Sequence, residues 1–236
     1  MLSGYQDAQV LAGAISENTP WARSPFRGDY TPKLSLKVNR QDRMIGKFAS
    51  RKTGVRLPYF SRYERDLYYL LEADPDVLGY ASQPAKLTFV LDGVERTHVP
   101  DCLVVTTSGQ HLIEVKPRSM AEMEYVKART TYLSQALRDV GFTYSISTET
   151  QIYADPTFSN ARVLCRYRAF NENESATFAV REYIRRFGPT RISVLIDTFK
   201  EYSDIKSCIL SATLRSRLRL APGAAVLSDP VLCLKT

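Results

Sequence analysis

Three charged residues interrupt a stretch of sequence that otherwise has the composition of β-strands. Asp101 precedes the apolar run CLVV, and Glu114 and Lys116 lie within the run HLIEVK. Burying a charge without a partner carries a large free-energy cost. These residues therefore either lie on a solvated face or bind something.

Strand periodicity predicts which of these side chains meet. Glu114 and Lys116 are two positions apart in a predicted strand over residues 110–116, so they share one face. A turn at residues 108–109 would make this strand antiparallel to the preceding one and place Asp101 opposite Lys116. We therefore expect two carboxylates and one ammonium group at one end of the strand pair.

This combination of groups is suited to metal-assisted phosphodiester hydrolysis. Carboxylate oxygens are the ligands that Mg²⁺ prefers, and the metal activates a water and stabilises charge on the phosphate. A neighbouring lysine can orient the water or help to deprotonate it. Without a histidine in the pattern, Mg²⁺ or Mn²⁺ is favoured over zinc. The alternative is an ion pair on a half-exposed sheet.

A third carboxylate is predicted on the helix that begins in SRYERDLYYLLEADPDV. Ser61 is a candidate N-cap, and Glu64 completes a capping box with it. Glu64 also lies on the helix face of Leu67 and Leu71, which points towards the sheet. It is therefore either a cap alone or also a metal ligand. Gln83, before a proline, is either a turn residue or an accessory residue near the site.

The charge distribution favours an anionic partner. The chain of 236 residues carries a net charge of +7, and residues 23–62 contain eleven basic residues against two acidic ones. Interleaved aromatic residues favour a segment that follows a phosphate backbone, and the alternative is a solvated surface arm. The candidate DNA-binding residues are Arg40, Arg43, Lys47, Arg51, Lys52, Arg56, Arg62 and, on a later helix, Lys127.

The four cysteines show no CxxC spacing, and there are only two histidines, so the pattern does not favour a structural zinc site. Cys102 and Cys208 lie among apolar residues and are predicted to be buried thiols. We find neither a signal peptide nor an apolar run of membrane-spanning length. A reducing cytoplasm is the expected location.

The predicted elements alternate between helix and strand. They are a helix from residue 61 to about 73, an antiparallel meander of strands at 85–91, 94–106 and 110–116, a helix at 120–141, a strand at 142–153 and a helix at 161–170. The segment NENES then reads as a hinge. Three short helices and a small hairpin follow it, which is the order of a winged-helix domain.

The quoted motifs resemble the PD-(D/E)xK nuclease superfamily, through VPD at 99–101, EVK at 114–116 and the upstream glutamate in SRYERD. Residues 35–150 resemble the TnsA family more closely. The resemblance implies an α/β (α+β) restriction-endonuclease-like core, with a mixed sheet flanked by helices, and a C-terminal winged-helix domain. The implied organisation is a basic arm (1–55), a nuclease domain (56–168) and a winged-helix-like domain (169–236).

TnsA proteins are endonuclease subunits of heteromeric cut-and-paste transposases. The resemblance implies that Glu64, Asp101 and Glu114 hold Mg²⁺ while Lys116 serves the attacking water. It implies cleavage of the 5′ strands at transposon ends, beside a DDE-type transposase subunit and in a bacterial, DNA-associated setting. The C-terminal domain would dock an AAA+ ATPase regulator. Some family members carry Gln at the position of Glu114. A free-standing restriction or repair nuclease and a non-catalytic DNA-binding scaffold are the alternatives.

Overall fold

The computed structural model describes residues 44–234 and divides into two compact units. Unit 1 runs to Tyr68 and resumes at Asp76–Ile152, and unit 2 contains Tyr69–Pro75 and the chain from Tyr153 onwards. Two of the candidate DNA-binding residues, Arg40 and Arg43, lie outside the described residues. The three-domain organisation expected from the sequence stays a prediction.

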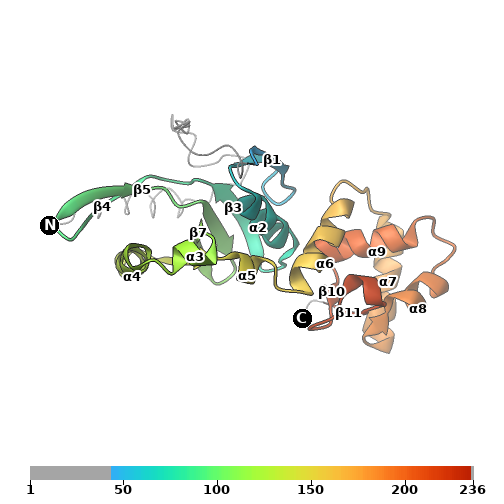
Figure 1. The fold of residues 1–236 in the computed structure, drawn as a ribbon. Helices are drawn as coiled ribbons and strands as arrows, with labels where there is room; N and C mark the ends of the chain where they lie inside the picture. The colour runs from blue at the N-terminus through green and yellow to red at the C-terminus, as the bar shows by residue number, and fades with distance from the viewer. Residues whose placement is uncertain (1–43, 235–236) are drawn as a thin grey trace. The chain divides into compact units, whose positions relative to one another are not determined.

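Unit 1 combines short strands with helices (Figure 1). Its elements are β1 (Gly46–Ala49), β2 (Arg56–Tyr59), the first part of α2 (Arg62–Ala73), β3 (Val77–Ser82), β4 (Leu87–Leu91), β5 (Val94–His98), β6 (Cys102–Thr106), β7 (Gly109–Val115), α3 (Arg118–Ala121), α4 (Glu124–Arg138), β8 (Phe142–Ser147) and α5 (Glu149–Ile152).

The central sheet of unit 1 has the strand order β3-β6-β7-β8. The pairs β3–β6 and β6–β7 are antiparallel, whereas β7–β8 is parallel, so the sheet is mixed. Helix α4 connects β7 to β8 and packs against β8, as a crossover between parallel strands requires. The mixed α/β architecture expected from the sequence is therefore present.

The predicted three-stranded meander is wrong. The single strand expected over 94–106 is two strands, β5 and β6, separated by Val99, Pro100 and Asp101. Proline has no N–H to donate to a ladder, so Pro100 interrupts the pairing. Strand β5 pairs with β4 in a separate ribbon, visible as the long hairpin in Figure 1. The antiparallel pairing of β6 with β7 was predicted correctly.

The register of β6 and β7 differs from the predicted one by two residues. Thr106 pairs with Gly109, so the tight turn is at residues 107–108, and Cys102 pairs with Ile113. Continuing this register by one residue places Asp101 opposite Glu114, not Lys116. Because the shift is even, the side chains keep the faces predicted for them.

Other differences are confined to missed strands and to element ends. The β1–β2 hairpin and β3 lie in segments for which we predicted no strand. The helix expected over 120–141 is α3 and α4, and the strand expected over 142–153 ends at Ser147 before α5. A hydrophobic core joins the β4–β5 ribbon, the central sheet and α4. It consists of Leu87, Phe89, Leu103, Leu112, Leu133, Leu137, Phe142 and Tyr144.

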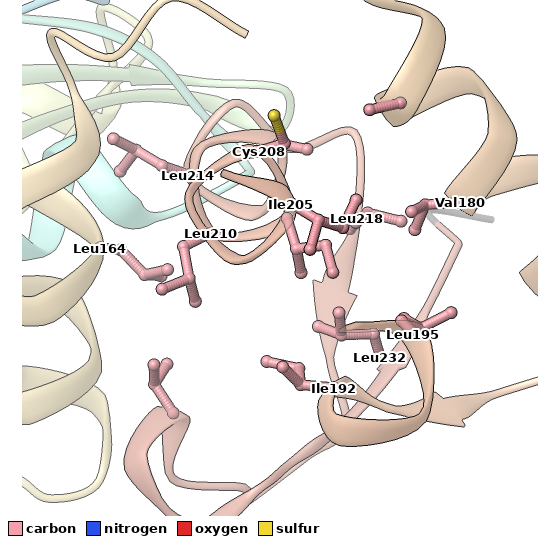
Figure 2. Packing of buried hydrophobic residues seen from close by; sticks show 14 of the residues in the cluster. Leu164, Val180, Ile192, Leu195, Ile205, Cys208, Leu210, Leu214, Leu218 and Leu232 are labelled. Carbon is pink, nitrogen blue, oxygen red and sulfur yellow. The ribbon is translucent and has the colours of Figure 1, made fainter. Parts of the chain in front are cut away.

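Unit 2 contains the remaining elements. They are α6 (Thr157–Leu164), the 3₁₀ helix η1 (Cys165–Tyr167), α7 (Glu174–Phe187), β9 (Thr190–Arg191), α8 (Ile192–Thr198), α9 (Ile205–Leu214), β10 (Arg219–Leu220), the 3₁₀ helix η2 (Val226–Ser228) and β11 (Val231–Cys233). Buried residues of α9 and its neighbours form the core shown in Figure 2. Cys102 and Cys208 are buried thiols, as predicted.

The segment predicted as a hinge is anchored within unit 2. The Glu172 side chain is fully buried, and its carboxylate lies 2.8 Å from Arg215 Nε and 3.2 Å from Arg217 Nη1. The sequence could not show this pairing, because both arginines follow α9. The three helices α7, α8 and α9 follow this segment, and β10, β11 and β9 form a three-stranded sheet of order β10-β11-β9. The winged-helix assignment stays a prediction.

Candidate active site

Strand β7 places Glu114 and Lys116 on the same side. Glu114 is only 3% exposed, and its Oε1 lies 2.6 Å from Lys116 Nζ. Burial would raise the pKa of the Glu114 carboxyl, but the neighbouring His98 and Lys116 outweigh it and the pKa is lowered. Glu114 is therefore an ionised, buried carboxylate next to an ammonium group.

Asp101 is the last residue of the segment between β5 and β6, and it contacts the end of β7. It therefore lies beside Glu114 and Lys116. Its Oδ2 accepts a hydrogen bond of 2.7 Å from the backbone N–H of Val115. Burial raises the pKa of Asp101 well above its ordinary value, and the negative charges of Glu114 and Glu64 raise it further. The three carboxylates are therefore close enough to repel one another.

Glu64 forms the predicted helix cap, while its role as a metal ligand stays a prediction. Its backbone N–H donates to Ser61 Oγ at 3.1 Å, and its Oε2 accepts from the backbone N–H of Phe60 at 2.9 Å. Its side chain is nonetheless buried, and its pKa is raised by burial and by the charge of Glu114. The helix cap therefore holds a carboxylate in the electrostatic field of the site.

Gln83 is adjacent to the site through its backbone. Its N–H donates to the carbonyl oxygen of Asp101 at 2.9 Å. Its φ of 44° lies in the left-handed region, which is uncommon for a residue other than glycine. Gln83 thus helps to fix the segment that carries Asp101, whereas an accessory role for its side chain stays a prediction.

Three residues of the site were missed by our sequence analysis. His98 Nε2 lies 3.0 Å from Glu114 Oε2, and Arg129 Nη2 lies 3.6 Å from Glu114 Oε1. The hydroxyl of Tyr144 forms a 2.9 Å hydrogen bond with His98 Nε2. The absence of a histidine from the motifs was therefore misleading, because β5 brings His98 into the site. The sequence offered one signal, namely that His98 is three residues from Asp101.

Comparison with known proteins agrees with this geometry. Residues 74–149 match the family model described as "TnsA-like endonuclease N terminal". The chain carries a TnsA-like endonuclease domain. The match includes Asp101, Glu114 and Lys116, whereas Glu64 precedes it. A comparison with curated proteins found no match.

The match supports an endonuclease-type role in transposition and, in general terms, DNA as a substrate and a transposase as a partner. Nucleases of this family typically need a divalent metal. No helix within residues 44–234 is long and apolar enough to cross a membrane.

The donor atoms of the TnsA-like domain fit a divalent cation in chemistry. Glu114 Oε2 is a buried oxygen with His98 Nε2 at 3.0 Å, and Glu64 and Asp101 add further carboxylates. As arranged here, residues 44–234 contain no group of three acidic, histidine or cysteine side chains already spaced as a metal site.

The candidate DNA-binding residues within the described part of the chain differ in their exposure and contacts. Lys47 and Arg56 are exposed on the β1–β2 hairpin, and Arg51 is exposed in the turn between these strands. Lys52 Nζ donates to the carbonyl oxygen of Val77 at 2.8 Å. The exposed Arg62 pairs with the buried Asp66 at 3.6 Å, and Lys127 pairs with Glu124 at 3.1 Å on an exposed helix face.

Proposed function

We propose that the protein is a Mg²⁺-dependent DNA endonuclease that cleaves the 5′ strands at transposon ends, with Mn²⁺ as an alternative metal. The observation that carries the proposal is the charge arrangement around Glu114. A buried carboxylate with one oxygen at Lys116 and the other at His98 lies within the electrostatic reach of Asp101 and Glu64.

The three acids would hold the metal through Glu114 Oε2 and the carboxylates of Asp101 and Glu64. When bound, the cation would stabilise charge on the scissile phosphate and lower the pKa of a water. The buried Glu64 and Asp101 side chains would be stabilised as anions by that charge, which removes the like-charge repulsion seen without it.

Lys116 would act on the water and the phosphate. Its ammonium group is half-exposed while its partner Glu114 is buried, so it lies at the boundary between the core and the solvent. A lysine at such a boundary can orient the attacking water and offset the negative charge that develops on the phosphate. Arg129, whose Nη2 lies 3.6 Å from the same Glu114 oxygen, adds positive charge that is largely buried.

The proposed setting is a transposition complex in the bacterial cytoplasm. A DDE-type transposase subunit would cut and join the 3′ ends, and the C-terminal unit, proposed as a winged-helix domain, would dock an AAA+ ATPase. The basic residues of the β1–β2 hairpin, together with Arg62 and Lys127, would contact the DNA backbone.

The test is a Mg²⁺-dependent cleavage assay on element-end DNA, with and without the DDE partner. The wild type is compared with Asp101→Asn and with Asp92→Asn. Asp92 is a matched control, because it is exposed in the β4–β5 turn with a φ of 55° that asparagine readily adopts.

We expect 5′-strand cleavage by the wild type and by Asp92→Asn when the partner is present, and none by Asp101→Asn. Cleavage without any partner would favour a free-standing nuclease. Absence of cleavage with all proteins folded would contradict the endonuclease proposal and favour a DNA-binding scaffold.

A further inference from the structure

A cavity of about 350 Å³ lies between the β4–β5 ribbon and α4, within unit 1. The residues that line it include Phe89, Leu91, Arg96 and Thr97 of the ribbon and Tyr125, Ala128 and Arg129 of α4. Ligand-binding cavities in proteins typically measure about 300–1,000 Å³. The volume is therefore large enough for a single nucleotide but too small for a DNA duplex.

The cavity adjoins the candidate active site through two residues. Arg129 lines the cavity, and its Nη2 lies 3.6 Å from Glu114 Oε1. Arg96 also lines the cavity and is two residues from His98 in β5, so these two side chains share a face of the ribbon. His98 Nε2 lies 3.0 Å from Glu114 Oε2. A ligand in the cavity would therefore lie next to the carboxylate proposed to hold the metal.

Arg96 is the positive charge of the cavity that is available to an anion. It is exposed, and among the described residues its side chain has neither an ion-pair nor a hydrogen-bond partner. Arg129, by contrast, is largely buried and already paired with Glu114. Asp92 is the acidic residue of the lining, but it lies in the exposed turn at the tip of the ribbon. Because a guanidinium group binds phosphate through paired N–H donors, Arg96 is suited to a phosphate.

An exposed aromatic ring lines the same cavity. Tyr125 is 59% exposed, and within residues 44–234 its side chain has no ring contact or hydrogen bond. Phe89, in the ribbon wall, is by contrast buried and stacks on Tyr132 with centroids 5.6 Å apart. Proteins that bind single strands use an aromatic ring for the base and a nearby cation for the phosphate. Tyr125 and Arg96 provide these two groups in one cavity.

We propose that this cavity binds one nucleotide of the DNA strand next to the scissile phosphate, with Arg96 on its phosphate and Tyr125 stacked on its base. The inference rests on the proposed function, because the nucleotide belongs to the same DNA substrate. In a duplex, the base has to leave the stack to reach Tyr125, as in enzymes that extrude a nucleotide. The bound nucleotide fixes the position of the scissile phosphate relative to Glu114 and Lys116.

The experiment measures binding of the full chain to a fluorescein-labelled element-end duplex by anisotropy, in EDTA so that no cleavage occurs. The variants are Arg96→Gln, Tyr125→Ala and Tyr125→Phe. Arg96→Gln should lower the slope of log affinity against log salt concentration by about one, the change expected for one lost phosphate contact. Tyr125→Ala should weaken binding by about tenfold, whereas Tyr125→Phe retains the ring and should bind as the wild type does.

Arg138→Gln is the matched control for Arg96→Gln. Arg138 is an exposed arginine in the last turn of α4, and it does not line the cavity. Its replacement should leave both the affinity and the salt slope unchanged. Thermal unfolding of each variant checks that a change in binding is not a loss of fold.

A base-removal scan identifies the nucleotide that enters the cavity. Duplexes that lack one base each, at successive positions around the cut, are compared in the wild type and in Tyr125→Ala. At one position, loss of the base should weaken wild-type binding as much as Tyr125→Ala does, with no further effect in the variant. If no position shows this non-additivity, the inference is wrong.

The remaining outcomes also decide the inference. A wild-type salt slope in Arg96→Gln, or wild-type affinity in Tyr125→Ala, would overturn it, as would absence of wild-type binding at low salt. The proposed function is judged separately, by metal-dependent cleavage in the presence of the DDE partner. Cleavage by a wild type whose cavity variants bind normally would therefore refute the inference alone.

Discussion

The carboxylate of Asp101 accepts a hydrogen bond of 2.7 Å from the backbone N–H of Val115, the residue between Glu114 and Lys116. This bond ties the segment before β6 to the end of β7, so that the side chain proposed as a metal ligand also fixes the strand that carries two other residues of the site. A substitution of Asp101 can therefore change stability, through loss of the hydrogen bond to Val115, and activity, through loss of the proposed metal ligand.

Asp101→Asn and Asp101→Ala are predicted to separate these effects. Both should lower cleavage by at least about 10³-fold, since the charge next to the reacting phosphate is lost. Asparagine retains an oxygen that can accept from Val115, whereas alanine leaves that N–H without its acceptor, at a cost of about 1–3 kcal/mol. Urea unfolding in EDTA should show Asp101→Asn to be the more stable variant. Equal stability of both would contradict a role for this hydrogen bond.

Ser61→Ala and Glu64→Gln are predicted to distinguish the helix cap from the metal ligand. Ser61→Ala removes the oxygen that caps the Glu64 N–H and should cost about 1 kcal/mol in the free energy of unfolding, with Mn²⁺ affinity retained. Glu64→Gln keeps an acceptor for the Phe60 N–H but loses the charge. It should weaken Mn²⁺ binding while stability changes little. Unchanged Mn²⁺ binding in Glu64→Gln would leave Glu64 as a cap alone.

Glu172→Ala is predicted to destabilise unit 2. It removes the buried carboxylate that faces Arg215 and Arg217, and loss of one partner of a buried ion pair typically costs about 3–5 kcal/mol. Chemical denaturation followed by circular dichroism measures the change. Glu201→Ala, at an exposed position of the same unit, is the control and should be nearly neutral. A neutral Glu172→Ala would mean that the segment 171–175 is a loose connection after all.

A pH effect is predicted at Asp229. The backbone N–H and the hydroxyl of Ser193 both donate to this carboxylate at 2.8 Å, and they lower the pKa of Asp229. A lowered pKa means that the stabilisation is present above the unfolded-state pKa and is lost as the pH falls through the folded-state pKa.

Ser193→Ala removes one of these two donors. In a carboxyl-detected NMR titration, the pKa of Asp229 should therefore rise towards its ordinary value. The destabilisation caused by the substitution should be larger at pH 7 than at pH 2. The same pKa in both proteins would show that the hydroxyl does not interact with the carboxylate in solution.

Local features of the sequence determined those parts of the fold that depend on neighbouring residues. The capping box of Ser61 and Glu64 and the alternation that puts Glu114 and Lys116 on one face follow from helical and strand periodicity alone. The β6–β7 register differs from the predicted one by two residues, an even number, so these faces are unchanged. Asp101 was therefore correctly expected near Glu114 and Lys116, although the predicted position of the turn was wrong.

Tertiary structure alone decided what surrounds Glu114. His98, Arg129 and Tyr144 come from β5, α4 and β8, and no local pattern relates these elements to one another. The sequence analysis likewise did not show that the β4–β5 ribbon is separate from the central sheet, or that Glu172 pairs with two arginines that follow α9. Periodicity specifies the face of each element, whereas the partners across that face depend on packing between distant segments, which becomes definite only when the chain folds.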